Sequence, residues 1–290
     1  MDIQQAITRQ IVAAMEAGKT NGAALWSGAG RLGMPYNFKT KQQYSGVNVL
    51  LLWIAARQAG YSTAAYLTYK QAQELGGQVK KNACGTMGVF YSTVAREIIN
   101  EATGETKQTS APLMKLFWLF NLDQIDGIER TATYVPTPFE AIEQAERVLQ
   151  GSGAVIHIGG TRAFYHRQDD AITLPDRERF AQPENFYAVA LHELCHWTGA
   201  ESRLDRVKGK RFGDEAYAFE ELVAELGSAF LMADLGLHEA TLEFHANYVE
   251  SWISALNDDK RCIFSAAKQA GQAYQYIKDL PAFAEREQAA

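Results

Sequence analysis

Apolar residues recur every three to four positions in several stretches of the chain, a spacing that predicts amphipathic helices. In the first half this spacing covers residues 2–18, 49–59 and 69–75. Thr68 is a candidate N-cap for the third of these helices, and Gly60 is placed to end the second. In the second half, the same spacing predicts helices over residues 138–149, 184–199, 215–236, 239–256 and 260–279.

Shorter stretches that are rich in apolar, β-branched and aromatic residues predict strands. They cover residues 87–94, 115–122 and 155–158, and a hairpin is expected over residues 163–174. The segment 100–110 is polar and rich in Thr and Glu, so we expect an exposed loop there.

A boundary is expected between residues 123 and 138, where Gly127, Pro136 and Pro138 cluster. The elements on its two sides predict an α+β protein with two domains. Residues 1–125 are expected to form a small α/β domain. Residues 126–290 are expected to form a mostly helical domain with a small sheet.

The composition is that of a globular protein, because 47% of the 290 residues are hydrophobic. No run of 18 apolar residues is present, and the first residues have neither a basic nor an apolar region. We therefore expect no membrane span and no secretory signal. The three cysteines form no C-x-x-C pair, which favours a reducing, cytoplasmic location.

The net charge of -6 is divided unevenly along the chain. Residues 1–125 contain 12 Lys and Arg against 7 Asp and Glu, a net +5, and the remainder has 16 against 27, a net -11. A basic front half favours a polyanionic partner, and two solvated surfaces of different composition explain the same numbers.

The strongest chemical signal is the sequence HELCH at residues 192–196. On a helix, His192 and His196 lie one turn apart on the same face, where both imidazoles can bind one Zn²⁺ ion. Glu193 lies beside them and is the candidate general base. A catalytic zinc site needs a third protein ligand and an open fourth position.

Candidates for the third ligand lie on the next long helix, in the sequence EELVAE at residues 220–225. Glu221 and Glu225 share a face one turn apart. We assign Glu221 as the ligand and Glu225 as a hydrogen-bond partner of a ligand histidine, and the reverse assignment stays open. Both could instead be solvated carboxylates. Glu220 is expected to face outward.

Other residues near this chemistry are weaker candidates. His245 could orient an oxyanion, although helix packing explains this residue equally well, and Tyr248, three residues later, is a candidate oxyanion helper. His157 lies in an apolar stretch and is expected to be a core residue, and His166 is expected in a turn. Cys195 points away from the metal face and is expected to be buried packing.

Aromatic and basic residues are interleaved between residues 26 and 91. Single-stranded nucleic acid is bound by this combination, because cations follow the phosphates and rings stack on the bases. The alternative is that most of these rings form a core, and Trp53, within an apolar helix, is expected to be buried.

Several motifs together resemble the ArdC-type antirestriction proteins of conjugative plasmids, whose N-terminal region also occurs in some plasmid primases. In the front half they are PYN at 35–37, YSGVNVLLL at 44–52, LTYKQA at 67–72 and LGGQVKK at 75–81. In the rear half they are DAITLP at 170–175, HELCHWTG at 192–199, SRL at 202–204 and YAFEELVAE at 217–225. The helix with Tyr248 and Trp252 completes the resemblance, which covers almost the whole chain.

This resemblance implies a single-stranded DNA-binding domain over residues 1–125 and a zincin-like metallopeptidase domain over residues 126–290. It also implies a role in protecting incoming DNA from host restriction, with a protein of the host restriction system as a further candidate partner. The expected DNA contacts are Trp26, Arg31, Asn37, Lys39, Lys41, Tyr44, Asn48, Lys70, Gln71, Lys80 and Lys81.

Three hypotheses follow from these observations. The first is a DNA-binding protein with an active zinc peptidase site. The second is a DNA-binding antirestriction protein with a non-catalytic zinc site, acting by coating DNA or by contacting a restriction enzyme. The third, a nuclease or primase-associated module, lacks support, because no cluster of acidic residues has the spacing of a two-metal site.

Overall fold

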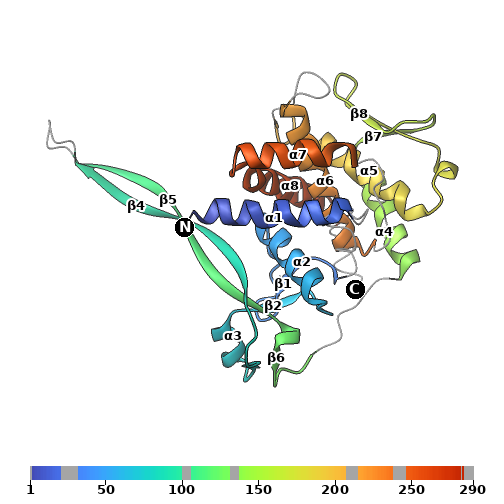
Figure 1. Ribbon diagram of the computed structural model, residues 1–290. Helices are drawn as coiled ribbons and strands as arrows, with labels where there is room; N and C mark the ends of the chain where they lie inside the picture. The colour runs from blue at the N-terminus through green and yellow to red at the C-terminus, as the bar shows by residue number, and fades with distance from the viewer. Residues whose placement is uncertain are drawn as a thin grey trace.

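The computed structural model describes residues 2–20, 32–99, 106–130, 137–206, 215–237, 246–281 and 283. Helices form the main body, and a long two-stranded hairpin projects from it (Figure 1). Within the described residues, no helix combines the length and the apolar character that crossing a membrane requires.

The front half contributes helices α1 (Ile3–Thr20), α2 (Val47–Ala59) and α3 (Tyr69–Glu74), which confirms the three predicted there. Gly60 adopts a left-handed conformation, with φ of 66°, and ends α2. Thr68 begins α3 through a capping box with Gln71, so its predicted role is confirmed.

A four-stranded sheet accompanies these helices in the order β1-β2-β5-β4. Its strands are β1 (Tyr36–Asn37), β2 (Ala65–Leu67), β4 (Thr86–Ile99) and β5 (Thr106–Asn121). Strand β1 is parallel to β2, and the other pairs are antiparallel. The 3₁₀ helix η2 (Leu122–Gln124) follows β5, and a small sheet pairs β3 (Gln78–Val79) with β6 (Ile125–Asp126).

The prediction of a loop over residues 100–110 was wrong for its second part, because β5 already begins at Thr106. Thr106 pairs with Ile99, and the register then continues without a break to Leu119 opposite Thr86. Threonine favours strands. Backbone pairing between β4 and β5 also extends the ladder over the polar ends of both strands. Residues 100–105 lie outside the described part.

The rear half begins with α4 (Pro138–Gly151) and a three-stranded sheet in the order β7-β9-β8. Strand β9 (Ala171–Leu174) pairs with β7 (Val155–Ile158) in parallel and with β8 (Phe164–His166) in an antiparallel hairpin, as predicted.

After the 3₁₀ helix η3 (Arg177–Arg179) come the remaining helices, which are α5 (Pro183–Thr198), α6 (Glu215–Leu235), α7 (Ala246–Asp258) and α8 (Cys262–Lys278). All four predicted helices are present. The predicted start of α7, at residues 239–245, falls outside the described residues.

The largest hydrophobic core crosses the expected domain boundary. It joins Ile11 of α1 and Leu50 of α2 to Leu191 of α5 and Leu226 of α6. The Trp53 ring, buried as predicted, lies 5.6 Å from the ring of Phe230, measured between centroids. The two halves are therefore packed on each other over a common apolar interior.

Candidate metal centre

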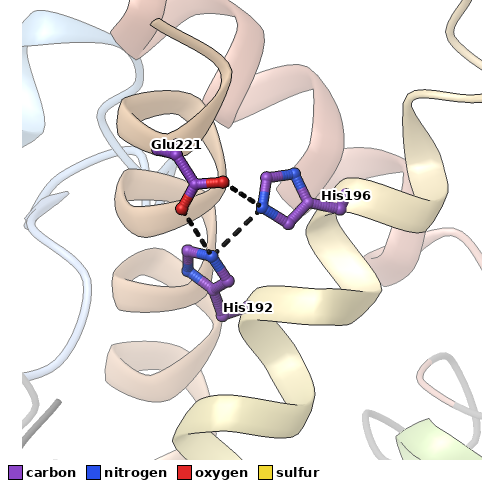
Figure 2. A group of neighbouring side chains, drawn as sticks. All are labelled: His192, His196 and Glu221. Carbon is purple, nitrogen blue, oxygen red and sulfur yellow. Dashed lines mark hydrogen bonds and ion pairs between the residues drawn. The ribbon is translucent and has the colours of Figure 1, made fainter. Parts of the chain in front are cut away.

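Helix α5 positions both histidines of the HELCH sequence. Pro183 occupies its first turn, where a missing N–H costs nothing, and Gly199 follows its last residue. The helix is buried along most of its length, and it packs against α6 in the core. His192 and His196 consequently face α6 from one side of α5, one turn apart (Figure 2).

Three donor groups converge between these helices. The two imidazole Nε2 atoms of His192 and His196 are 3.1 Å apart. The Glu221 carboxylate of α6 lies across from both, with Oε1 3.3 Å from Nε2 of His196 and Oε2 3.6 Å from Nε2 of His192 (Figure 2). The three donor atoms all lie within 4.8 Å of one another.

These separations suit a single small cation. Ligand nitrogens about 2.0–2.1 Å from a tetrahedral Zn²⁺ lie roughly 3.3 Å from each other, close to the 3.1 Å between the two Nε2 atoms. Two imidazoles and one carboxylate are also a donor set that zinc accepts, with one position left for water or substrate.

The remaining nitrogen of each histidine faces another glutamate of α6. Nδ1 of His196 is 3.2 Å from Oε1 of Glu220, and Nδ1 of His192 is 3.7 Å from Oε2 of Glu225. Both glutamates are buried. A carboxylate on Nδ1 holds the proton there and leaves Nε2 as the ligand atom, so Glu221 is better placed than Glu225 to bind the metal.

The expectation that Glu220 faces outward was wrong. The buried guanidinium of Arg206 donates hydrogen bonds to both carboxylate oxygens of Glu220, at 2.8 and 3.2 Å. Arg206 is itself held by Oγ1 of Thr198 and by the carbonyl of Cys195. Sequence reasoning could not find this contact, because Arg206 lies 14 residues before Glu220 and outside any helix.

The charge balance also favours a bound cation. Among the described residues, four buried carboxylates lie at the centre, those of Glu193, Glu220, Glu221 and Glu225, against one buried guanidinium, that of Arg206. Buried charge is costly unless it is compensated. Burial alone would lower the pKa of His192, but the carboxylates of Glu221 and Glu225, 3.6 and 3.7 Å from its two ring nitrogens, outweigh it and raise the pKa to about 10.

The carboxylates shift in the opposite direction. Burial would raise the pKa of Glu220, but bonds to His196 and Arg206 lower it to about 2. The pKa of Glu221 is also lowered, since its bonds to the two histidines overcome the effect of burial. The pKa shifts of His192, Glu220 and Glu221 thus arise from pairing between imidazoles and carboxylates, the groups that a divalent cation binds.

A tyrosine that sequence reasoning missed also reaches the centre. Tyr217 lies one turn before Glu221 on α6 and hydrogen-bonds both Glu221 and Tyr248. Burial, followed by the charge of Glu221, raises the pKa of Tyr217. The Tyr217 and Tyr248 ring centroids are 6.2 Å apart, so Tyr248 approaches the centre through Tyr217. The spacing from Tyr217 to Glu221 is the sequence signal that could have found it.

The other candidates of the rear half lie away from the donors. Cys195 is fully buried, and burial raises the pKa of its thiol to about 12, so its predicted packing role is confirmed. His157 was expected in the core but is exposed, because β7 is an edge strand whose side chains are mostly uncovered. His166 ends β8, and its Nδ1 atom is 2.7 Å from Oδ2 of Asp169 in the adjoining turn.

The structure brings three of the expected DNA-binding residues together. Nδ2 of Asn37 donates hydrogen bonds to the hydroxyl of Tyr44, at 3.2 Å, and to Oε1 of Gln71, at 3.0 Å. Oδ1 of Asn37 accepts from the backbone N–H groups of Lys39 and Thr40. The side-chain amides of Asn37 and Gln71 connect β1, the following turn and α3. Most of their hydrogen bonds therefore stabilise the fold.

The expected lysines lie on the surface around this cluster. Lys39 pairs with Glu74 at 2.5 Å, and Nζ of Lys70 is 3.9 Å from the same carboxylate. Nζ of Lys80 donates to the carbonyl of Asp123 at 2.8 Å. Lys41 lies over the ring of Phe38, 4.0 Å from its centroid, and Lys81 is exposed.

Asn48 has a structural role. Its amide donates to the carbonyl of Val89 and accepts from the N–H of Val89, at 2.9 and 2.8 Å, and so covers the free edge of β4. The expected contacts Trp26 and Arg31 lie outside the described residues.

Comparison with known proteins gives a family match in each half of the chain. The model for the N-terminal domain of anti-restriction factor ArdC matches residues 1–120, and that for a zincin-like metallopeptidase matches residues 143–269. The uncharacterized protein y4eC of Sinorhizobium fredii is 38% identical over 98% of this chain and 94% of its own length.

Two Escherichia coli proteins called DNA primase TraC are 35% and 37% identical, and the chain spans only 20% and 25% of their lengths. Among solved structures, the metal-free antirestriction ArdC protein of plasmid R388 has a TM-score of 0.80 at 38% identity, covering 98% of this chain and 99% of that one. Its Mn(II)-bound form has a TM-score of 0.77 at 36% identity, covering 96% and 98%.

Proposed function

The chain belongs to the ArdC family of antirestriction proteins, and on this premise we propose that it protects the DNA of a mobile element from host restriction. In this proposal the front half binds single-stranded DNA without sequence preference, and the rear half is a zinc-dependent peptidase. The similarity to the R388 protein extends over nearly the whole chain, which supports carrying both parts into one function.

The observation that carries the peptidase proposal is the convergence of His192, His196 and Glu221 on one point. We assign these residues as the ligands of Zn²⁺. When bound there, zinc would lower the pKa of a water molecule and polarise a peptide carbonyl. The R388 relative was solved with Mn(II), but two nitrogen ligands favour zinc over manganese.

Glu193 is the proposed general base. It follows His192 directly on α5 and is buried at the centre. In this role it takes a proton from the attacking water and passes it to the leaving amine. Tyr248, held beside the centre by Tyr217, stays a candidate to stabilise the oxyanion.

The test replaces the base without touching the ligands. We expect Glu193→Ala to keep one zinc ion per chain and to lose cleavage of a fluorescent casein substrate by about 10²–10⁴-fold, the contribution of a general base. Metal content is measured by atomic emission alongside activity. Undiminished cleavage by a metal-loaded Glu193→Ala protein would refute this mechanism.

The alternative is a metal site without catalysis, in a protein that acts by coating DNA or by contacting a restriction enzyme. The same variant separates the two functions. A peptidase requirement predicts that Glu193→Ala abolishes protection of incoming DNA during conjugation, whereas the alternative predicts intact protection. Within the part of the chain that the structure describes, three protein donors converge, which favours the catalytic form, since structural zinc sites are usually closed by four.

A further inference from the structure

Large apolar side chains lie uncovered along one face of β5, beside α3. Trp118 is 56% exposed, Tyr69 at the start of α3 is 45% exposed, and Leu116 is 39% exposed. Phe120, which is partly buried against a smaller apolar cluster, follows Trp118 on the same side of β5 and contacts the ring of Tyr69. We call Tyr69, Leu116, Trp118 and Phe120 the Trp118 face. Contiguous exposed apolar residues of this size mark an interaction site in a soluble domain.

Strand geometry aligns these rings. Residues 116, 118 and 120 alternate along β5 and so point to the same side, about 7 Å from one to the next. The Tyr69 ring meets the Phe120 ring edge to face, with centroids 6.3 Å apart. A Cβ atom at Gly85 would lie only 3.1 Å from Cζ of Phe120 and 3.3 Å from Cβ of Trp118. A larger residue there would crowd both side chains.

Lysines lie on the two segments that border this face, α3 and the turn before β4. Lys70 follows Tyr69 in α3, and its side chain is 86% exposed. Lys80 and Lys81 lie in the turn after β3 that leads through Gly85 into β4. The carboxylates that pair with these lysines are Glu74, which Lys39 and Lys70 approach, and Asp126, 3.7 Å from Nζ of Lys80. The four lysines outnumber these two carboxylates, and residues 1–125 as a whole carry a net +5.

Rings that are open to solvent and flanked by cations fit a chain of unpaired bases. Bases of single-stranded DNA expose their faces for stacking, whereas duplex DNA keeps them covered. Stacking does not discriminate between bases, and lysines can follow the phosphates on either side. The apolar rings would also suit a partner protein, but the excess of positive charge favours a polyanion.

We propose that single-stranded DNA crosses the Trp118 face, with bases stacked on Trp118 and Tyr69 and with phosphates near Lys70 and Lys81. This inference rests on the single-stranded DNA binding proposed above, and it locates that site. It assigns Trp118, outside the residues expected from the sequence, as a principal contact.

The experiment measures binding of the full chain to a fluorescein-labelled oligo(dT) of about 20 nucleotides by anisotropy. We expect Trp118→Ala and Tyr69→Ala each to weaken binding by about 5- to 150-fold, the effect of removing one stacked base. Trp118→Phe should recover most of the affinity. Lys81→Gln should reduce the slope of log K against log salt by about 0.7.

Phe90→Ala is the matched control. Phe90 is 57% exposed on the same hairpin, but it pairs with Lys115, three residues from Trp118, and therefore points to the opposite face. Its affinity for the oligonucleotide should equal that of the wild type. Circular dichroism melting verifies that every variant is folded.

The outcomes separate this inference from the function on which it rests. Absence of binding by the wild-type chain refutes the DNA-binding proposal and this inference with it. Tight binding by the wild type that Trp118→Ala and Tyr69→Ala leave unchanged overturns the inference alone. If light scattering shows that Trp118→Ala converts a dimer into a monomer, the face belongs to a second copy of the chain, and the inference is also overturned.

Discussion

At the scale of single residues, each histidine of the candidate metal centre has its own glutamate near the nitrogen that faces away from the other donor atoms. Glu220 bonds His196, and Glu225 lies near His192, while Glu221 faces both Nε2 atoms. The three glutamates of EELVAE therefore have different contacts, which their positions on α6 and their partners on α5 determine.

Glu220 gives the residue-scale prediction. In Glu220→Gln, an amide still occupies the space beside Arg206 but no longer places a negative charge on Nδ1 of His196. We expect zinc affinity, measured by competition with a fluorescent chelator, to fall by about 10–100-fold. Glu250→Gln, at an exposed position of α7, is the control and should bind as the wild type does. Equal affinity in both variants would show that Glu220 does not orient the ligand.

Sequence reasoning at this scale succeeded where the relevant residues share a helix. The i, i+4 spacing predicts that His192 and His196 face together, and the structure shows this. Glu220 was misjudged because its burial depends on Arg206, which reaches it from a segment whose path no periodicity reveals. His157 was misjudged because an apolar stretch does not tell an edge strand from a buried one.

At the scale of elements, the metal centre depends on the close approach of α5 and α6. Gly227 is the point of contact: a Cβ atom there would lie 2.8 Å from Sγ of Cys195, well inside contact distance. No side chain larger than hydrogen fits unless the sulfur moves.

The element-scale prediction is a double-mutant cycle on this contact. We expect Gly227→Ala to destabilise the protein by about 1–3 kcal/mol through overpacking, measured by urea unfolding of the metal-free chain. In a Cys195→Ala background the sulfur is gone, and the same change should cost much less. Strictly additive effects of the two substitutions would contradict the proposed clash.

The long helices were predictable from sequence because their apolar faces repeat over many turns. Strands β1, β2, β3 and β6 were not, since two or three residues are too few for alternation to be visible. The ends of β4 and β5 were missed because their polar composition resembles that of a loop, whereas backbone pairing with a neighbouring strand decides their structure.

At the scale of the whole molecule, the two halves are coupled by a common core. Besides the contact of Trp53 with Phe230, Nε2 of Gln43 donates to Asp234 of α6 at 2.9 Å, and Oε1 of Gln43 accepts from the hydroxyl of Tyr274. A cut near residue 125 would expose this apolar interior. Tests of either proposed activity therefore need the full chain.

The domain order could be predicted from sequence through motifs, but the packing of the halves could not. The expected boundary follows from Gly and Pro residues, which mark a change of direction in the backbone and carry no information about what packs across it. The uneven charge of the two halves likewise indicates partners, not contacts.

The most direct test of the central claim is a calorimetric titration of the metal-free full chain with Zn²⁺. We predict one ion per chain, and an affinity that His192→Ala and Glu221→Ala each lower by more than about 100-fold, beyond the effect of losing a supporting hydrogen bond. His157→Ala, at an exposed histidine of β7, should leave both values unchanged. Wild-type stoichiometry and affinity in His192→Ala would contradict the account.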